Sequence, residues 1–143
     1  MSTVEQNRSR VRSAAAGAAA ATAWALLEPL DQRAFRYGYS DVALLGKLVT
    51  RGPHCRAAGL ALHATNGAIF GLAYHETSRR YGWSAVRLAM LEHVVLFPLS
   101  ALVDRYHPAR GTDGIPKLVT TRAFGQATVR HALFGLLLGR LAR

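Results

Sequence analysis

Cysteine, aromatic residues and acidic residues are all scarce in this chain of 143 residues. The single cysteine, Cys55, excludes an internal disulfide framework and a metal site built from cysteines alone. Aromatic residues make up 8% of the chain, and 8 acidic residues stand against 18 basic ones, so the formal net charge is +10. Half of the residues are hydrophobic, which excludes a disordered chain. The length allows one domain, residues 1–143.

Charged residues are also missing from long internal stretches. Residues 13–27 and 57–75 contain no Lys, Arg, Asp or Glu, residues 88–103 contain only Glu92, and residues 123–139 contain only Arg130. These runs lie within four segments of about 20 residues, the length of helix that crosses a ~30 Å hydrocarbon core. We therefore expect an all-α protein with four transmembrane helices, at 13–31, 57–75, 83–103 and 121–140.

A soluble, basic helical protein that binds nucleic acid is the alternative. The mean hydropathy of +0.10 is low for a protein with four spans. However, segment 57–75 has no charged face to present to water. The basic residues are spread over all the connecting segments instead of being concentrated on one helix, so we expect them to contact the headgroups of a lipid bilayer and expect no nucleic acid partner.

The first apolar segment has features of a cleaved signal peptide. Arg8, Arg10 and Arg12 would form its basic region, and residues 21–23 its cleavage site. The apolar character continues past that site through Trp24, so we favour a retained span preceded by a flexible basic N-terminus at 1–12. The expected location is a bacterial inner membrane, crossed several times. Basic residues are divided almost evenly between the two sides, so they predict no orientation.

The sequence contains signs of an internal duplication. The tetrapeptide KLVT occurs at 47–50 and again at 117–120, and each copy is followed by the pattern H-x-x-x-G-x-x-x-G, at His63 and at His131. This order predicts two similar helical hairpins, with repeat units at about 13–75 and 83–140. Segment 41–49 would be either a short amphipathic helix at the membrane interface or an ordinary loop.

Small residues recur at helical spacing in the second and fourth predicted spans. Glycines let helix backbones approach closely in a bilayer, where no hydrophobic effect drives helices together. We therefore expect segments 57–75 and 121–140 to form the tightly packed pair. The glycines predicted to pack there are Gly59, Gly67, Gly71, Gly135 and Gly139.

Six ionisable residues are expected to lie at depth. They are Glu28, His63, Glu92, His93, Arg130 and His131. An ionised side chain in the bilayer is costly unless it is paired or hydrated, so we expect Glu92 and Arg130 to pair with each other. The alternative is a path for protons or ions along Glu92, His93 and His131.

Motifs for cofactors and catalysis are absent from the sequence. No E-x-x-H occurs, so a di-iron site is excluded, and His63 and His131 could at most ligate a haem from its two faces. We expect no metal and no other cofactor. The sequence also lacks a phosphate-binding loop, a G-x-S-x-G motif and an H-E-x-x-H motif, and we do not expect an enzyme.

The two H-x-x-x-G-x-x-x-G segments, the first extended by Tyr74, resemble those of a diffuse group of small four-span bacterial integral membrane proteins. That resemblance implies a location and a fold but no activity. The expected function is a structural or accessory one, alone as a homo-oligomer or with another membrane protein. A small proton, ion or solute permeation unit that uses the buried Glu, His and Arg residues is the alternative.

Overall fold

A computed structural model describes residues 2–143, and this part of the chain contains helices and no strands. The elements are α1 (Thr3–Phe35), α2 (Asp41–Val49), α3 (Cys55–Tyr81), α4 (Ala85–Leu96), a 3-10 turn η1 (Phe97–Leu99), α5 (Ser100–Tyr106) and α6 (Thr121–Leu141). The all-α prediction is confirmed. Segments 13–31, 57–75 and 121–140 lie within single helices, whereas segment 83–103 begins before α4 and passes through η1 into α5. Segment 41–49 forms a short helix, which is the first of the two alternatives left open for it.

The basic N-terminus is helical, so the expectation of a flexible segment at 1–12 is wrong for residues 3–12. The Ser2 hydroxyl accepts a hydrogen bond from the Glu5 amide, and the Glu5 carboxylate accepts one from the Ser2 amide at 2.7 Å. This reciprocal cap satisfies amides that a helix start leaves without partners. Further along, Arg10 forms an ion pair with Glu76 of α3. Met1 lies outside the described residues.

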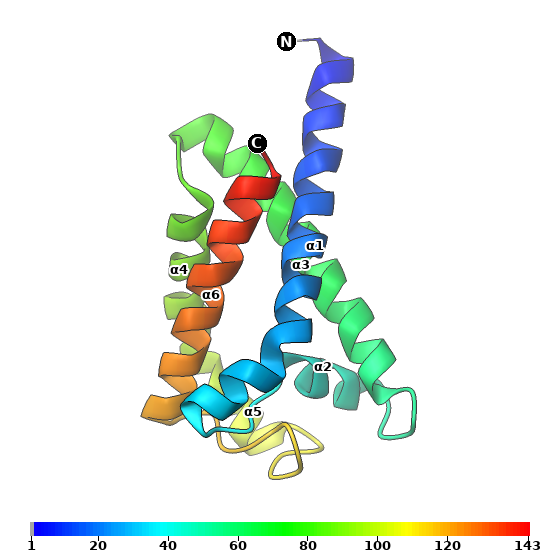
Figure 1. Cartoon of the computed structure of the whole chain (residues 1–143), viewed down its shortest axis with the longest axis vertical. Helices are drawn as coiled ribbons and strands as arrows, with labels where there is room; N and C mark the ends of the chain where they lie inside the picture. Colours follow the sequence, from blue (N-terminus) through cyan, green and yellow to red (C-terminus); the bar gives the residue numbers. More distant parts are fainter. Residues whose placement is uncertain (1) are drawn as a thin grey trace.

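Two prolines change the course of the helices. Pro98 has no N–H to donate, and its ring crowds the preceding turn, so the segment from Ala85 to Tyr106 passes through the 3-10 turn η1 between α4 and α5. Pro29 lies inside α1. The last turns of α1 bend away from the helix axis beyond this residue (Figure 1).

The long helices form two antiparallel pairs. α1 packs along α3, α4 packs along α6, and contacts between α1 and α6 join the pairs. Both termini and the α3–α4 turn lie at one end of the molecule, whereas α2, α5 and the segment before α6 lie at the other (Figure 1). The two KLVT copies differ in conformation, because residues 47–49 end α2 and residues 117–120 are non-helical. The duplication therefore stays a prediction.

Glycines set the close approach within each pair. A Cβ at Gly17 would overlap the Gly67 carbonyl of α3, and one at Gly71 would overlap the Ser13 carbonyl of α1. In the other pair, Gly135 lies against the Val86 backbone of α4. The predicted tight pairing of segments 57–75 and 121–140 is therefore wrong, because their glycines face α1 and α4 instead of each other.

The two remaining glycines that were predicted to pack, Gly59 and Gly139, have different surroundings. Gly59 packs against the carbonyl of Val42 in α2, so it serves as a packing residue but toward the short helix. A Cβ at Gly139 would meet only the Ala85 Cβ, at 3.5 Å, which is an ordinary contact. The structure therefore does not require glycine at 139, contrary to the prediction.

Small side chains fill the interior, and large ones cover the exterior. Most of the buried hydrophobic residues are alanines, including Ala20 and Ala89, which have no exposed surface. Large apolar side chains are exposed on each long helix, for example Leu26, Ile69, Val95 and Leu136. Within the part of the chain that the structure describes, one segment, Ala85–Tyr106, is both long and apolar enough to cross a membrane by length and composition.

Candidate functional site

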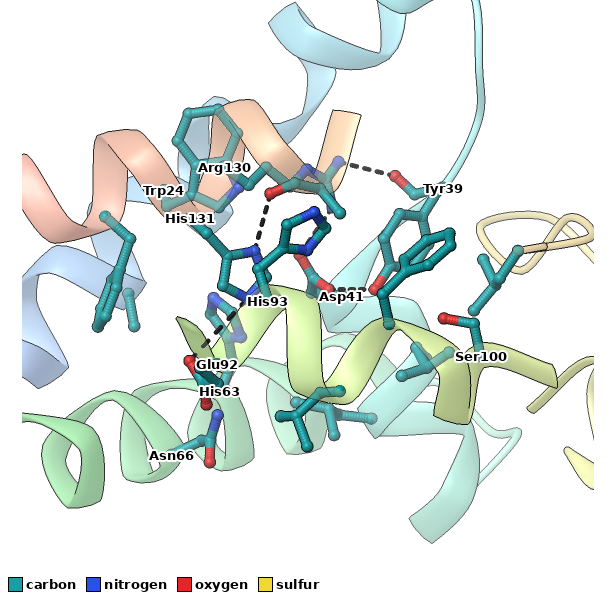
Figure 2. Close-up of a pocket in the computed structure, with 18 of the residues that line it drawn as sticks. Trp24, Tyr39, Asp41, His63, Asn66, Glu92, His93, Ser100, Arg130 and His131 are labelled. Atoms are coloured by element: carbon teal, nitrogen blue, oxygen red, sulfur yellow. Dashed lines mark hydrogen bonds and ion pairs between the residues drawn. The ribbon is translucent and has the colours of Figure 1, made fainter. Parts of the chain in front are cut away.

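A cavity of about 380 Å³ lies between the two helix pairs (Figure 2). Its apolar walls come from α1, α2, α3, α6 and the segment from α4 to α5. Five of the six ionisable residues that were expected at depth line it, namely His63, Glu92, His93, Arg130 and His131. The sixth, Glu28, is 3.7 Å from Arg130 (Oε1 to Nη1). The fold thus brings together residues from four helices that are far apart in the sequence.

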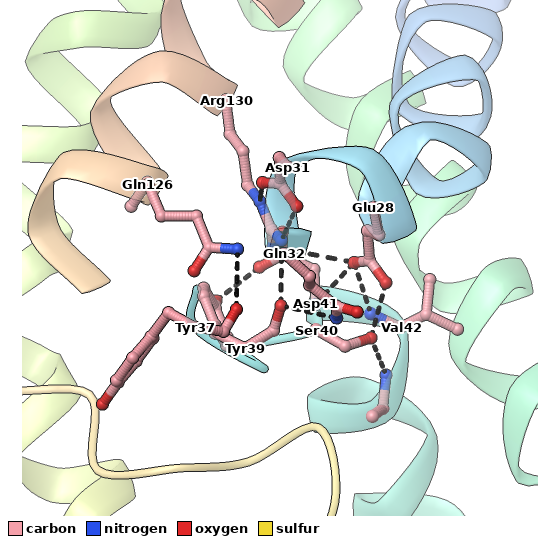
Figure 3. A network of polar contacts seen from close by, with 12 residues as sticks. Glu28, Asp31, Gln32, Tyr37, Tyr39, Ser40, Asp41, Val42, Gln126 and Arg130 are labelled. Carbon is pink, nitrogen blue, oxygen red and sulfur yellow. Dashed lines mark hydrogen bonds and ion pairs between the residues drawn. The ribbon is translucent and has the colours of Figure 1, made fainter. Parts of the chain in front are cut away.

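Arg130 of α6 is bound by residues of α1, of the connection after it and of the start of α2 (Figure 3). Its Nε and Nη2 donate to the two carboxylate oxygens of Asp31, at 2.5 and 2.9 Å, and its Nη1 donates to Asp41 at 2.7 Å. Nη2 also donates to the Tyr39 carbonyl at 2.9 Å. The residue is 3% exposed. A planar guanidinium suits this arrangement, because its donors point to several acceptors at once.

Glu28 organises the start of α2. Its carboxylate accepts hydrogen bonds from the Ser40 hydroxyl at 2.5 Å and from the Asp41 and Val42 amides at 2.7 and 3.3 Å. The Ser40 hydroxyl in turn accepts from the Ala43 amide and caps α2. The first amides of a helix lack partners within the helix and favour a negative charge nearby. Glu28 therefore fixes α2 and, through Asp41, one of the ligands of Arg130.

The expected pairing of Glu92 with Arg130 is wrong. Arg130 is saturated by acceptors from α1 and the segment leading into α2. The bend of α1 beyond Pro29 and the left-handed conformation of Arg36, with φ of 48°, turn the chain so that residues 39–41 reach α6. That turn and Asp31 of α1 supply the partners of Arg130, and Glu92 is not among them.

Charge and burial determine the ionisation of the cavity residues outside the four long helices. Burial raises the pKa of the Asp41 carboxyl, but the charges of Arg130 and His63 and a hydrogen bond from the Tyr39 hydroxyl outweigh it, so the pKa of Asp41 lies below its usual value. Burial, followed by the nearby Asp41 charge, raises the pKa of the Tyr39 hydroxyl well above its usual value. Tyr39 is therefore a neutral donor and Asp41 an ionised acceptor at neutral pH.

A second polar group of the cavity consists of Glu92, His93 and His131, from α4 and α6. The His131 Nδ1 lies 2.8 Å from the Ala127 carbonyl, which can only accept, so this nitrogen carries a proton. The His131 Nε2 faces the Glu92 carboxylate at 4.0 Å. The His93 ring stacks on His131 with centroids 4.8 Å apart, and its Nε2 lies 2.9 Å from the Thr128 hydroxyl. Glu92 and His131 together can therefore hold one proton at the cavity wall.

The geometry does not fit a haem between His63 and His131. A haem ligand needs a ring nitrogen free to face the iron. The His131 Nδ1 is bonded to a carbonyl, its Nε2 faces Glu92, and the His93 ring covers one side of it. No group of three His, Cys, Asp or Glu residues arranged to hold a metal ion occurs in residues 2–143.

Four residues of the site were missed in the sequence. Asp31 was visible, since it lies one helical turn from Glu28 in a predicted span, and a search for acids that share a helix face would have found it. Tyr39 and Ser40 lie in the connection before α2, and Asp41 begins that helix; no motif marks them. Comparisons of the chain with protein-family models, curated proteins and solved structures found no match.

Proposed function

We propose that this chain is a four-span integral membrane protein, of the bacterial inner membrane, with a structural or accessory function and no catalytic activity. One observation supports this proposal above the others, namely that polarity is reversed relative to a water-soluble protein. Ionisable side chains lie between the helices, and large apolar side chains cover their outer faces. In lipid, this distribution places each kind of surface in its favoured surroundings.

The exposed fractions show the size of the reversal. Leu26, Ile69 and Val95 are 71%, 60% and 61% exposed, whereas Gln126 and Arg130 are 0% and 3% exposed. In water, this arrangement would cost free energy twice, because apolar surface would remain hydrated and a charge would be desolvated. A bilayer removes the first cost, and the carboxylates around Arg130 reduce the second.

Helix length and charge placement agree with four spans. α1, α3 and α6 contain 33, 27 and 21 residues, and the segment Ala85–Tyr106 contains 22, so each is long enough to cross the hydrocarbon core. Every Lys and Arg except Arg130 lies near a helix end or in a connecting segment. Basic residues in these places can contact anionic headgroups on both sides of the bilayer.

The contacts in the interior support the proposed accessory function. The charged groups of the Arg130 network bind each other and tie the two helix pairs together, so they hold the protein in one arrangement. Such a rigid, apolar-faced bundle can support a membrane partner or a second copy of itself through its outer faces.

Fractionation tests the membrane location. Membranes from cells that express the chain are washed with high salt and then with alkaline carbonate, and the protein is followed by immunoblot. We expect it to remain in the washed pellet and to be released only by detergent. Release by carbonate would contradict the proposal and would favour the soluble, basic alternative.

Proton handling is a second candidate, which the Glu92–His131 pair favours. A carboxylate and an imidazole that face each other at 4.0 Å in a cavity wall can exchange a proton with a passing water molecule. The test is proton flux into proteoliposomes under a potential, followed with a pH-sensitive dye. Glu92→Gln should abolish the flux, and Glu76→Gln, at the exposed end of α3, should leave it unchanged. Equal flux in liposomes without protein would contradict this candidate.

A further inference from the structure

We propose that the cavity between the helix pairs is a binding site for a small lipophilic organic cation, such as an aromatic ammonium compound. Its charge, its free carboxylate, its aromatic walls and its opening each support this assignment.

The charge of the interior favours a cationic ligand over an anionic one. Four carboxylates lie at or next to the cavity (Glu28, Asp31, Asp41 and Glu92), and one basic residue, Arg130, accompanies them. The Arg130 donors are already directed at two carboxylates and a carbonyl. Counted against Arg130, these four carboxylates give the region more acidic than basic groups, although the whole chain carries +10. Such a region attracts a cation.

Glu92 is the carboxylate available to that cation. Within residues 2–143, its one ion-pair partner is His131, at 4.0 Å, and its side chain is 26% exposed. The other three carboxylates are bound to Arg130 or to the amides of α2. A positively charged ligand beside Glu92 would therefore meet a carboxylate without a strong counter-charge.

The walls fit the apolar part of such a ligand. Aromatic side chains approach from several elements, namely Trp24, Tyr39, Phe70, Phe97 and Phe134. The Trp24 and Tyr39 rings already face the Arg130 guanidinium. Phe70, Phe97 and Phe134 are therefore the aromatic walls that face no cation within residues 2–143. Aromatic faces attract organic cations, and the attraction strengthens when water is excluded. The volume of about 380 Å³ lies at the small end of the range for small-molecule sites, roughly 300–1,000 Å³. A ligand with one ring and one ammonium group matches this size.

The cavity has an opening through which such a ligand could enter. The exposed residues among its lining, Asn66, Leu96 and Leu99, belong to α3 and to the segment from α4 to η1. These two elements make few contacts with each other. If the proposed membrane location holds, on which this one step rests, the opening faces the bilayer, where lipophilic cations accumulate.

Binding can be measured on the purified full chain in detergent through the fluorescence of Trp24. Trp83, the other tryptophan, is replaced in a Trp83→Phe background so that Trp24 alone reports from the cavity wall. The probes are benzyltrimethylammonium, its neutral isostere neopentylbenzene and the anion benzylsulfonate, each corrected with protein-free micelles. We expect benzyltrimethylammonium to bind at least tenfold more tightly than either of the other two.

Matched variants locate the site. Glu92→Gln should weaken binding of the cation at least tenfold and leave the neutral probe unchanged, whereas Glu76→Gln should change neither. Circular dichroism and the Trp24 emission maximum check that each variant is folded. Equal binding of the cation and its isostere, tighter binding of the anion, or no binding of the cation to folded protein would each overturn the proposal. The assay uses detergent, so a failure of the membrane proposal would appear separately, in the carbonate wash.

Discussion

At the scale of single residues, Arg130 connects the two halves of the molecule. It is carried by α6, yet its carboxylate ligands, Asp31 and Asp41, come from α1 and α2. All of these groups are largely removed from solvent, so each charge depends on the others for its stability. Removal of one member of such a set leaves the rest buried without compensation.

Replacement of Arg130 by glutamine should destabilise the protein strongly. Asp31 and Asp41 would lose their counter-charge, and loss of one partner of a buried pair costs about 3–5 kcal/mol. The free energy of unfolding can be measured in detergent by circular dichroism. Arg140→Gln, at the exposed end of the same helix, is the matched control and should be neutral. The double variant Arg130→Gln, Asp31→Asn should recover part of the loss, and equal losses in single and double variants would contradict this account.

Sequence reasoning could identify the interior polar residues but not their partners. A charge inside an apolar run is visible in the sequence, and Glu92 and Arg130 were found in this way. The partners depend on the bend beyond Pro29 and on the left-handed turn at Arg36, which bring residues 39–41 under α6. A local sequence pattern does not show that residues 39–41 come close to α6 in the folded chain.

At the scale of elements, glycines decide which helices pair. The position of each long helix follows from clusters of charge, proline and glycine, and the extent of α6 was predicted closely, at 121–140. The predicted segments 13–31 and 57–75 are shorter than α1 and α3, because both helices continue into charged residues at their ends. The partners could not be predicted, because a G-x-x-x-G pattern shows that a helix packs but does not say against which helix. Gly17 was overlooked because it lies within an alanine-rich run, where it forms no pattern of its own.

Gly17→Ala and Gly139→Ala should have different effects. The first places a methyl group on the Gly67 carbonyl of α3, and such overpacking costs about 1–3 kcal/mol. The second meets only Ala85 at 3.5 Å and should be neutral or slightly stabilising, because alanine favours helix over glycine. Thermal unfolding in detergent compares the two. Equal midpoints would show that α1 and α3 do not pack through Gly17.

Asp104 of α5 holds the connection that leads into α6. Its two carboxylate oxygens accept hydrogen bonds from the Leu118 and Val119 amides, at 2.6 and 2.8 Å. Asp104→Ala would leave both amides without this acceptor, at a cost of about 1–3 kcal/mol. Hydrogen exchange should then become faster at residues 118 and 119, and Asp113→Ala, an exposed acid in the same connection, should leave it unchanged. Unchanged exchange in Asp104→Ala would contradict the assigned contact.

At the scale of the whole molecule, two antiparallel helix pairs enclose a mostly apolar cavity that contains a few ionisable side chains, and they present apolar faces outward. Both termini lie at one end of the bundle, and the starts of α3 and α6 lie at the other (Figure 1). A chain that crosses a membrane an even number of times has both termini on the same side, as this placement of the helices allows. Insertion as four spans therefore predicts which positions share a side of the membrane, although the sequence predicts no orientation.

Labelling of single cysteines tests four-span insertion most directly. The natural Cys55 lies at the start of α3, and Asn7→Cys and Arg143→Cys, each in a Cys55→Ser background, mark the two termini. Sealed vesicles are treated with a membrane-impermeant maleimide before and after permeabilisation. We predict that positions 7 and 143 react from the same side and that Cys55 reacts from the opposite side. Reaction of all three positions from one side would contradict the four-span account.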